Sequence, residues 1–405
     1  MTARPELETL ATNARSKEYS RCTSTSFGTA SMKTLVFAFI AAIAVDALHA
    51  QENESGGSSL NLTIGNSGIA FGHADRVNGI RINWKDRSFD YVNGMNLTFW
   101  IPDGKPYYGT VNGLAIGLTA PAGERLHGVA ITPGAVLAEE HMIGLNAGLL
   151  ALVSQGDIYG LNIGGLASVA EGSIRGASIS ALAIVSQGPT DGLSLAGLAT
   201  VSQGGLGGIS FSGLAAVSQG PMWGLNVAGL ATVSQGDLTG FSFAGLAAVT
   251  QGSVTGVTVG GLATVAQGDV SGVSLGGLAV VSQGGQYGVN LGGIALVAED
   301  AIHGINVTIG QLQSEQELAG LNVGLYKMES PSITGVNVGL IWTESEELRW
   351  FSVSGYNRTY DIQKGLTIGL LNYAGDLLGI QIGLFNIVKA NPPLFRYLPF
   401  INARF

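Results

Sequence analysis

Apolar and small polar residues alternate along most of this chain in a pattern that repeats every 16 residues. A glycine begins each repeat from Gly128 to Gly320, and no repeat in that range contains an insertion. A typical unit is GLNVAGLATVSQGDLT, which runs from Gly224 to Thr239 and is followed by GFSFAGLAAVTQGSVT. A fixed period of this kind predicts a repeat array. Degenerate copies continue it on both sides, so we expect residues 51–405 to form a single β-repeat domain.

Each unit has the period-two alternation and the Val, Ile, Phe and Thr content of a β-strand, without helical spacing. The Gln-Gly pair near the end of the unit, as at Gln235 and Gly236, places a turn where a positive φ costs little. The sequence therefore predicts an all-β fold in which strands of about 10 to 11 residues are joined by connections of about five. One face of a strand would carry Leu225, Val227, Gly229, Ala231 and Val233, and the other Asn226, Ala228, Leu230, Thr232 and Ser234.

An antiparallel transmembrane β-barrel is the architecture that we favour from the sequence. Strands of about 9 to 11 residues are the length that crosses an outer membrane. The residue after each Leu-Ala is polar and apolar in turn, as at Ser168, Ile184 and Thr200, which gives a 32-residue superperiod that suits a hairpin. The ending FRYLPFINARF resembles the terminal signal of outer-membrane barrels, so Phe405 is a candidate membrane-insertion signal.

A β-solenoid is the alternative, in which each unit is one coil and like residues stack. The regular period, three glycines per unit and an Asn/Ser column through Asn162, Ser178, Ser194, Ser210 and Asn226 support it. The near absence of basic residues between Leu126 and Tyr326 and the few aromatic residues in the central units do not fit a barrel.

Two segments precede the repeat domain. Residues 1–31 are polar and lack hydrophobic periodicity, and we interpret them as disordered or as a spurious N-terminal extension. Residues 32–50 have a basic start, an apolar run and small residues at Ala47 and Ala50, which is typical of a signal peptide. We therefore predict an exported protein of the outer membrane or cell surface.

Composition removes several function classes. The formal net charge of −9 disfavours nucleic acid, which requires a basic face. The single cysteine, Cys22, precedes the predicted signal peptide, so thiol chemistry and disulfides are not expected in the exported part. The 62 glycines mark a glycine-rich chain in which most glycines are expected in turns.

The late units GLNVGLYKME, GVNVGLIWTE, GLTIGLLNYA and GIQIGLFNIV resemble bacterial surface-repeat proteins with tandem GLQIGLxN-type units. That resemblance implies a location in the cell envelope and supplies no catalytic residues. The central GLATVSQG units differ from this family pattern by one additional residue and by Thr or Ala where the family often has Asn.

No catalytic, cofactor or metal site is expected from the sequence. The histidines lack the spacing of a zinc site, and the aspartates lack the regularity of a calcium repeat. Aromatic and charged residues collect near both ends of the array, where loops favour ligand or partner contacts. The candidates are Trp84, Arg87, Trp100, Tyr107, Tyr108, Trp342 and Trp350.

The sequence leaves two non-enzymatic functions open. The first is an outer-membrane or cell-surface repeat protein, structural or porin-like, whose partners would be membrane lipid and the barrel-insertion machinery. The second is an exported β-solenoid that acts as an adhesin or glycan-binding surface.

Overall fold

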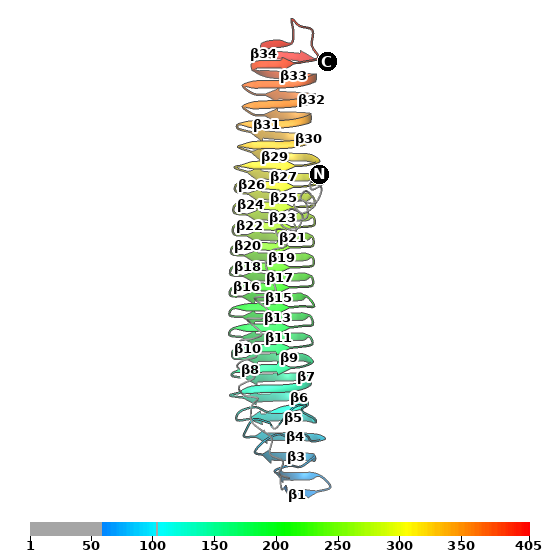
Figure 1. Ribbon diagram of the computed structural model, residues 1–405, viewed down its shortest axis with the longest axis vertical. Helices are drawn as coiled ribbons and strands as arrows, with labels where there is room; N and C mark the ends of the chain where they lie inside the picture. The colour runs from blue at the N-terminus through cyan, green and yellow to red at the C-terminus, as the bar shows by residue number, and fades with distance from the viewer. Residues whose placement is uncertain (1–58, 103) are drawn as a thin grey trace, which may run out of the picture. The chain divides into compact units, whose positions relative to one another are not determined.

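The computed structural model describes residues 59–102 and 104–405, and in these residues the chain is a β-solenoid of about 19 turns. Figure 1 shows the strands of successive coils stacked one upon the next. The predicted N-terminal extension (1–31) and signal peptide (32–50) lie outside the described residues. In the described part, no helix is long and apolar enough to cross a membrane.

The first coils are built from β1 (Leu60–Ile64), β2 (Ser67–Phe71), β3 (Arg76–Asn83), β4 (Tyr91–Thr98), β5 (Thr110–Gly117), β6 (Ala122–Thr132) and β7 (Ala135–Gly148). The long strands of the central coils are β9 (Asp157–Gly164), β11 (Ile174–Ser180), β13 (Thr190–Ala196), β15 (Leu206–Ser212), β17 (Met222–Ala228), β19 (Leu238–Ala244), β21 (Val254–Gly260), β23 (Val270–Gly276), β25 (Gln286–Gly292), β27 (Ile302–Thr308) and β29 (Glu317–Gly324).

The short strands of the central coils are β8 (Ala151–Ser154), β10 (Ala167–Ala170), β12 (Ala183–Ser186), β14 (Ala199–Ser202), β16 (Ala215–Ser218), β18 (Ala231–Ser234), β20 (Ala247–Thr250), β22 (Ala263–Ala266), β24 (Ala279–Ser282), β26 (Ala295–Ala298) and β28 (Gln311–Ser314). The last coils are built from β30 (Lys327–Gly339), β31 (Trp342–Val353), β32 (Tyr356–Ile368), β33 (Leu371–Val388) and β34 (Tyr397–Arg404).

Each central coil contains one long strand and one short strand. After β17 the chain turns at Gly229 and Leu230, continues as β18, and turns again at the Gln-Gly pair before β19. The long strands of successive coils pair with one another in parallel, and the short strands do the same. The result is two parallel sheets that face each other across a thin interior.

The predicted antiparallel barrel is wrong, and the solenoid alternative is the fold. Each residue of a central strand pairs with the residue 16 positions later, as Asn226 does with Ser242. A barrel would require sequential antiparallel neighbours, whereas the antiparallel pairs among the described strands join β1 to β2 and β33 to β34. The 32-residue superperiod does not mark hairpins, since Ser168 and Ile184 are parallel neighbours in one inner column.

The interior is narrow and lined largely by small residues. Asn226, Ala228, Thr232 and Ser234 are buried, as predicted for one face of the strand. Leu230, which the alternation assigned to the same face, instead lies in a turn with 44% of its surface exposed. The alternation breaks there because the chain changes direction between the two sheets.

The predicted Asn/Ser column exists, and its residues stack in register. Side-chain hydrogen bonds follow part of it, from Asn146 Nδ2 to Asn162 Oδ1 at 2.9 Å and from Asn162 Nδ2 to Ser178 Oγ at 3.3 Å. A second run joins Asn290, Asn306, Asn322 and Asn337 at 2.8–2.9 Å. An asparagine side chain both donates and accepts, so stacked asparagines satisfy one another inside the coil.

The glycine that begins each unit lies within the long strand and not at a corner. Gly240 has a φ of +106°, a conformation that disfavours residues with a Cβ. A Cβ at Gly240 would lie 2.4 Å from the carbonyl oxygen of Gly224 in the preceding coil. The other two glycines of the unit, Gly229 and Gly236, lie at the two turns.

A buried ion pair fills the interior of the first coils. The Arg81 Nη1 and Asp86 Oδ1 atoms are 3.1 Å apart, and their side chains are 1% and 3% exposed. Asn83, Asn96 and Thr98 also donate hydrogen bonds to Asp86, at 2.7–3.0 Å. Burial lowers the pKa of the Arg81 guanidinium, and Asp86 opposes this effect.

Candidate functional site

The outer face of the short-strand sheet changes character in the last coils. In the central coils this face presents alanine and valine, such as Ala231 and Val233 of β18. From β30 to β32 the corresponding positions carry aromatic and charged side chains. These side chains, together with Tyr360 at the following turn position, form what we call the C-terminal patch, which consists of Lys327, Glu329, Trp342, Glu344, Tyr356, Arg358 and Tyr360.

Parallel pairing of the coils assembles the C-terminal patch. Lys327, Trp342 and Tyr356 occupy the same position in successive coils and form one column. Glu329, Glu344 and Arg358 form the adjacent column. Parallel neighbours are spaced about 4.8 Å apart, so residues about 15 positions apart in sequence become contacts.

Glu344 is the centre of the polar contacts in the patch. Its carboxylate lies 3.4 Å from Lys327 Nζ and 3.8 Å from Arg358 Nη1, and it accepts a 2.5 Å hydrogen bond from the Tyr360 hydroxyl. Partial burial raises the pKa of Glu344, but the bonds from Tyr360 and Lys327 outweigh it and hold that pKa below its usual value. The Glu344 carboxylate is therefore ionised at neutral pH, and these contacts fix its orientation.

The aromatic rings of the patch are held against its bases. The Trp342 and Tyr356 rings have centroids 5.5 Å apart, and Lys327 Nζ lies 5.5 Å from the Trp342 ring centroid. The Arg358 guanidinium lies 4.5 Å from the ring centroid of Tyr360. Such cation–π contacts restrict the rotamers of both partners. The patch is thus a preorganised surface of rings and charges on a regular sheet.

The sequence predicted part of this patch. Trp342 belongs to it, whereas Trp350 lies in the glycine column of the long-strand sheet, between Gly335 and Gly365, and is 73% exposed. Lys327, Tyr356 and Arg358 were missed. Their signal was present in the sequence, because the positions they occupy are Ala or Val in most central units.

The N-terminal candidates divide into exposed and buried residues. Trp84 stacks on Trp100 with ring centroids 6.2 Å apart, and both are exposed. Tyr108 is also exposed, but Tyr107 is 8% exposed, and burial raises its pKa to about 12. Arg87 is partly buried. The structure brings Trp84 and Trp100 together and gives Tyr107 a packing role.

A second polar cluster lies on the outer face of the first coils. Asn78, Asn93, Asn112 and His127 form a hydrogen-bonded row at 2.8–3.1 Å, and His127 Nε2 lies 2.8 Å from His141 Nε2. The sequence placed these histidines apart, and the parallel register brings them together. In the described residues, no three His, Cys, Asp or Glu side chains are grouped to hold a metal ion.

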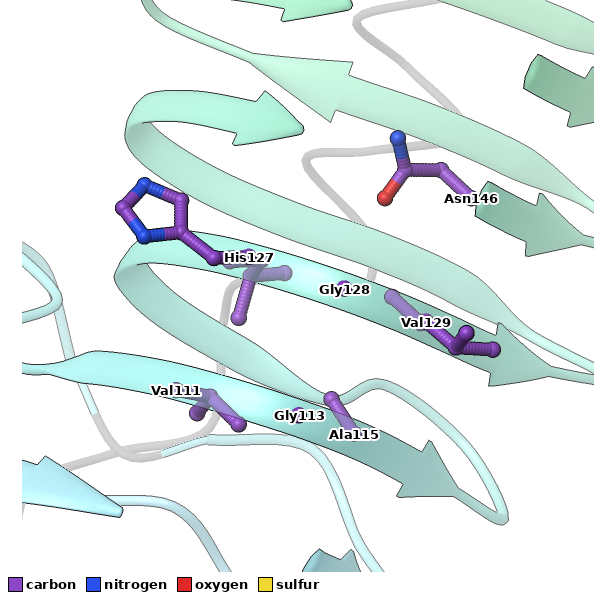
Figure 2. Close-up of a pocket in the computed structure, with 9 residues that line it drawn as sticks. Val111, Gly113, Ala115, His127, Gly128, Val129 and Asn146 are labelled. Carbon is purple, nitrogen blue, oxygen red and sulfur yellow. The ribbon is translucent and has the colours of Figure 1, made fainter. Parts of the chain in front are cut away.

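Figure 2 shows residues that line a small hollow beside His127, with the His127 ring projecting away from Gly128 and Val129. The hollow is lined by residues of β5, β6 and β7 and has no space for a water molecule. The exposed surfaces are therefore the stronger candidates for binding.

The His127 imidazole is expected to titrate below the ordinary histidine value. Burial lowers its pKa, and the positive charges of His141 and Arg125 lower it further. Because of this lowered pKa, the unfolded chain binds more protons at His127 than the folded chain does. The contribution of His127 to the free energy of unfolding is therefore fully present above about pH 6.5 and is lost as the pH falls below 6.5.

An NMR titration of ring-labelled histidine would measure this midpoint. The His141→Gln variant removes the neighbouring imidazole and is expected to move the His127 midpoint upward, whereas His303→Gln is not. A His127 midpoint above 6.5 in the parent chain would contradict the argument.

The remaining sequence-derived candidate is Phe405, which follows β34 and is 90% exposed. Its role as an insertion signal stays a prediction, without the barrel that motivated it. No protein-family model matches the chain, and no curated protein or solved structure matches it either. The resemblance to bacterial surface-repeat proteins therefore also stays a prediction.

Proposed function

We propose that this chain is an exported, non-enzymatic β-solenoid that acts as an adhesin-like surface and binds glycans through the C-terminal patch. The observation that carries the proposal is the replacement of Ala and Val by rings and charges on the outer face of β30, β31 and β32. The predicted signal peptide at 32–50 supports export. The resemblance to surface-repeat proteins supports a place in the cell envelope.

The chemistry of the patch fits a sugar. Trp342 and Tyr356 are half-buried neighbouring rings on the outer face, and aromatic rings of this kind supply a large apolar contact for a sugar ring. Glu329, Glu344, Lys327 and Arg358 offer acceptors and donors for hydroxyl groups. Because two acids and two bases balance, the patch favours a neutral glycan over a charged one, and its binding is expected to depend little on salt.

A glycan array followed by calorimetry on the strongest ligand tests this function. Trp342→Ala is expected to weaken binding by about tenfold or more, since aromatic side chains dominate binding surfaces. Trp223→Ala is the matched control, because Trp223 is 52% exposed on a central coil outside the patch.

Two results would reject the proposal. One is an array on which no neutral glycan binds the folded chain. The other is equal weakening by Trp342→Ala and Trp223→Ala, which would show that binding does not occur at the patch. Circular dichroism of both variants checks that the β-structure is retained.

A further inference from the structure

The central coils separate charge from apolar surface. Between Gly144 and Glu317 every Asp, Glu, Lys and Arg lies in the segment that runs from the Gln-Gly turn to the next unit's glycine, equivalent to Gln235–Thr239. We call this side of the stack the glutamine edge. Its charged residues are Asp157, Glu171, Arg175, Asp191, Asp237, Asp269, Glu299, Asp300, Glu315 and Glu317.

The opposite turn forms an exposed apolar ridge, which we call the leucine edge. It consists of Leu166, Leu182, Leu198, Leu214, Leu230, Leu246, Leu262, Leu278 and Ile294. Each of these side chains is between 38% and 60% exposed. Backbone bonds hold them in line, since the Leu230 N–H donates to the Leu214 carbonyl at 2.8 Å and the Leu246 N–H donates to Leu230 at the same distance.

The surface beside the leucine edge is apolar as well. A shallow open groove of about 380 Å³ runs there across the long strands, and its apolar walls are Ile179, Leu195, Phe211 and Val227. Phe211 and Phe243, which project from the same face, are 41% and 39% exposed. Ridge and groove together form a continuous uncharged surface.

Aromatic residues occupy the same turn position beyond both ends of this edge, with Thr119 and Gly134 between Trp100 and Leu150 and Gly310 between Ile294 and Tyr326. Trp100 lies in the turn equivalent to the leucine turn, and its N–H donates to the Trp84 carbonyl at 2.7 Å. At the other end, Tyr326 occupies the turn between β29 and β30 and is 59% exposed. Tryptophan and tyrosine at the limits of an apolar surface are typical of the interface between acyl chains and water.

We infer that the leucine edge and its groove dock into the acyl layer of one leaflet of a lipid bilayer, with the glutamine edge in water. This surface is independent of the proposed glycan patch. The charge separation matches the requirement of an in-plane membrane element, which places apolar residues in lipid and keeps charges out of it.

The shape of the edge favours lipid over a second copy of the chain. Two convex ridges would touch along a strip about 10 Å wide, and about ten coils at 4.8 Å give roughly 500 Å² on each copy. A stable dimer buries about 800 Å² on each partner. Fluid acyl chains instead follow a convex ridge and fill the groove beside it.

Flotation of the purified full chain with phosphatidylcholine vesicles tests the inference. The chain is expected to float with the vesicles and to stay bound in high salt, because the contact contains no ion pairs. The variant with Leu214→Gln, Leu230→Gln and Leu246→Gln is expected to lower partitioning by about tenfold or more, since each leucine loses part of its apolar transfer free energy.

The matched control changes the same coils on the other edge, with Gln219→Ser, Gln235→Ser and Gln251→Ser, and is expected to partition like the parent chain. Circular dichroism verifies the fold of both variants. A parent chain that stays unbound, or equal losses in the two variants, would overturn the inference. The edge would instead be an interface between copies if two results came together: the parent chain forms an oligomer without lipid that the three leucine substitutions dissociate, and the leucine variant floats with vesicles as the parent chain does.

Discussion

Replacing Asp86 with alanine is expected to destabilise the first coils by about 3–5 kcal/mol, because it leaves the Arg81 guanidinium buried without its counter-charge. Arg81 and Asp86 lie inside the coil, where their side chains are almost fully buried. Asn83, Asn96 and Thr98 would also lose an acceptor. The effect is expected to be local, since each coil contacts mainly its neighbours.

Hydrogen exchange of the amides in β3, β4 and β5 measures this change, since it resolves local opening that a whole-chain unfolding curve averages. Asp90→Ala is the control. Asp90 forms a 2.6 Å ion pair with Arg76, but both side chains are more than half exposed, so its loss is expected to change the stability very little. Equal losses of protection in the two variants would refute the role assigned to the buried pair.

Replacing Gly240 with alanine is expected to destabilise the central coils by about 1–3 kcal/mol from backbone conformation alone. The added Cβ would also meet the Gly224 carbonyl at 2.4 Å, which forces adjacent coils apart and weakens their hydrogen bonds. Protection of amides in β17 and β19 and the thermal midpoint measure the effect.

Thr239→Ala is the matched control for the glycine column, because Thr239 precedes Gly240 in β19 and its side chain is exposed. It is expected to shift the thermal midpoint very little. The Gly240→Ala variant could instead leave both the thermal midpoint and the amide exchange unchanged. That result would show that the glycine column tolerates a Cβ and that the register between coils is less constrained than its geometry indicates.

The polarity of the coil explains how one chain presents two different surfaces. Many hydroxyl groups inside the coil bond to turn carbonyls, as Ser234 Oγ does to Gly236 at 2.9 Å, although buried polar atoms of Ser210 and Asn226 have no such bond. Outward-facing residues are therefore free to be apolar in the central coils and aromatic or charged in the last ones. The proposed lipid contact and the proposed glycan contact then occupy separate stretches of one continuous stack.

The sequence by itself determined the β-character of the unit, the turn at the Gln-Gly pair and the composition of the two faces, but it missed the turn at Gly229 and Leu230 that divides each unit into two strands. A 16-residue period in which Asn226 and Ala228 alternate with Leu225 and Val227 has one local solution, a strand with a small polar face and an apolar face. The predicted turns at Gln235 and Gly236 are confirmed for the same reason, since turn chemistry is local.

Tertiary structure alone decided between barrel and solenoid, because both architectures accept the same alternation within a strand. The choice depends on which strand lies beside which, and parallel stacking of Asn226 on Ser242 is a long-range pairing that no single unit encodes. The same register brought Lys327 to Glu344 and His127 to His141. Contacts between coils are set by the stack as a whole, so the candidate sites became visible only with it.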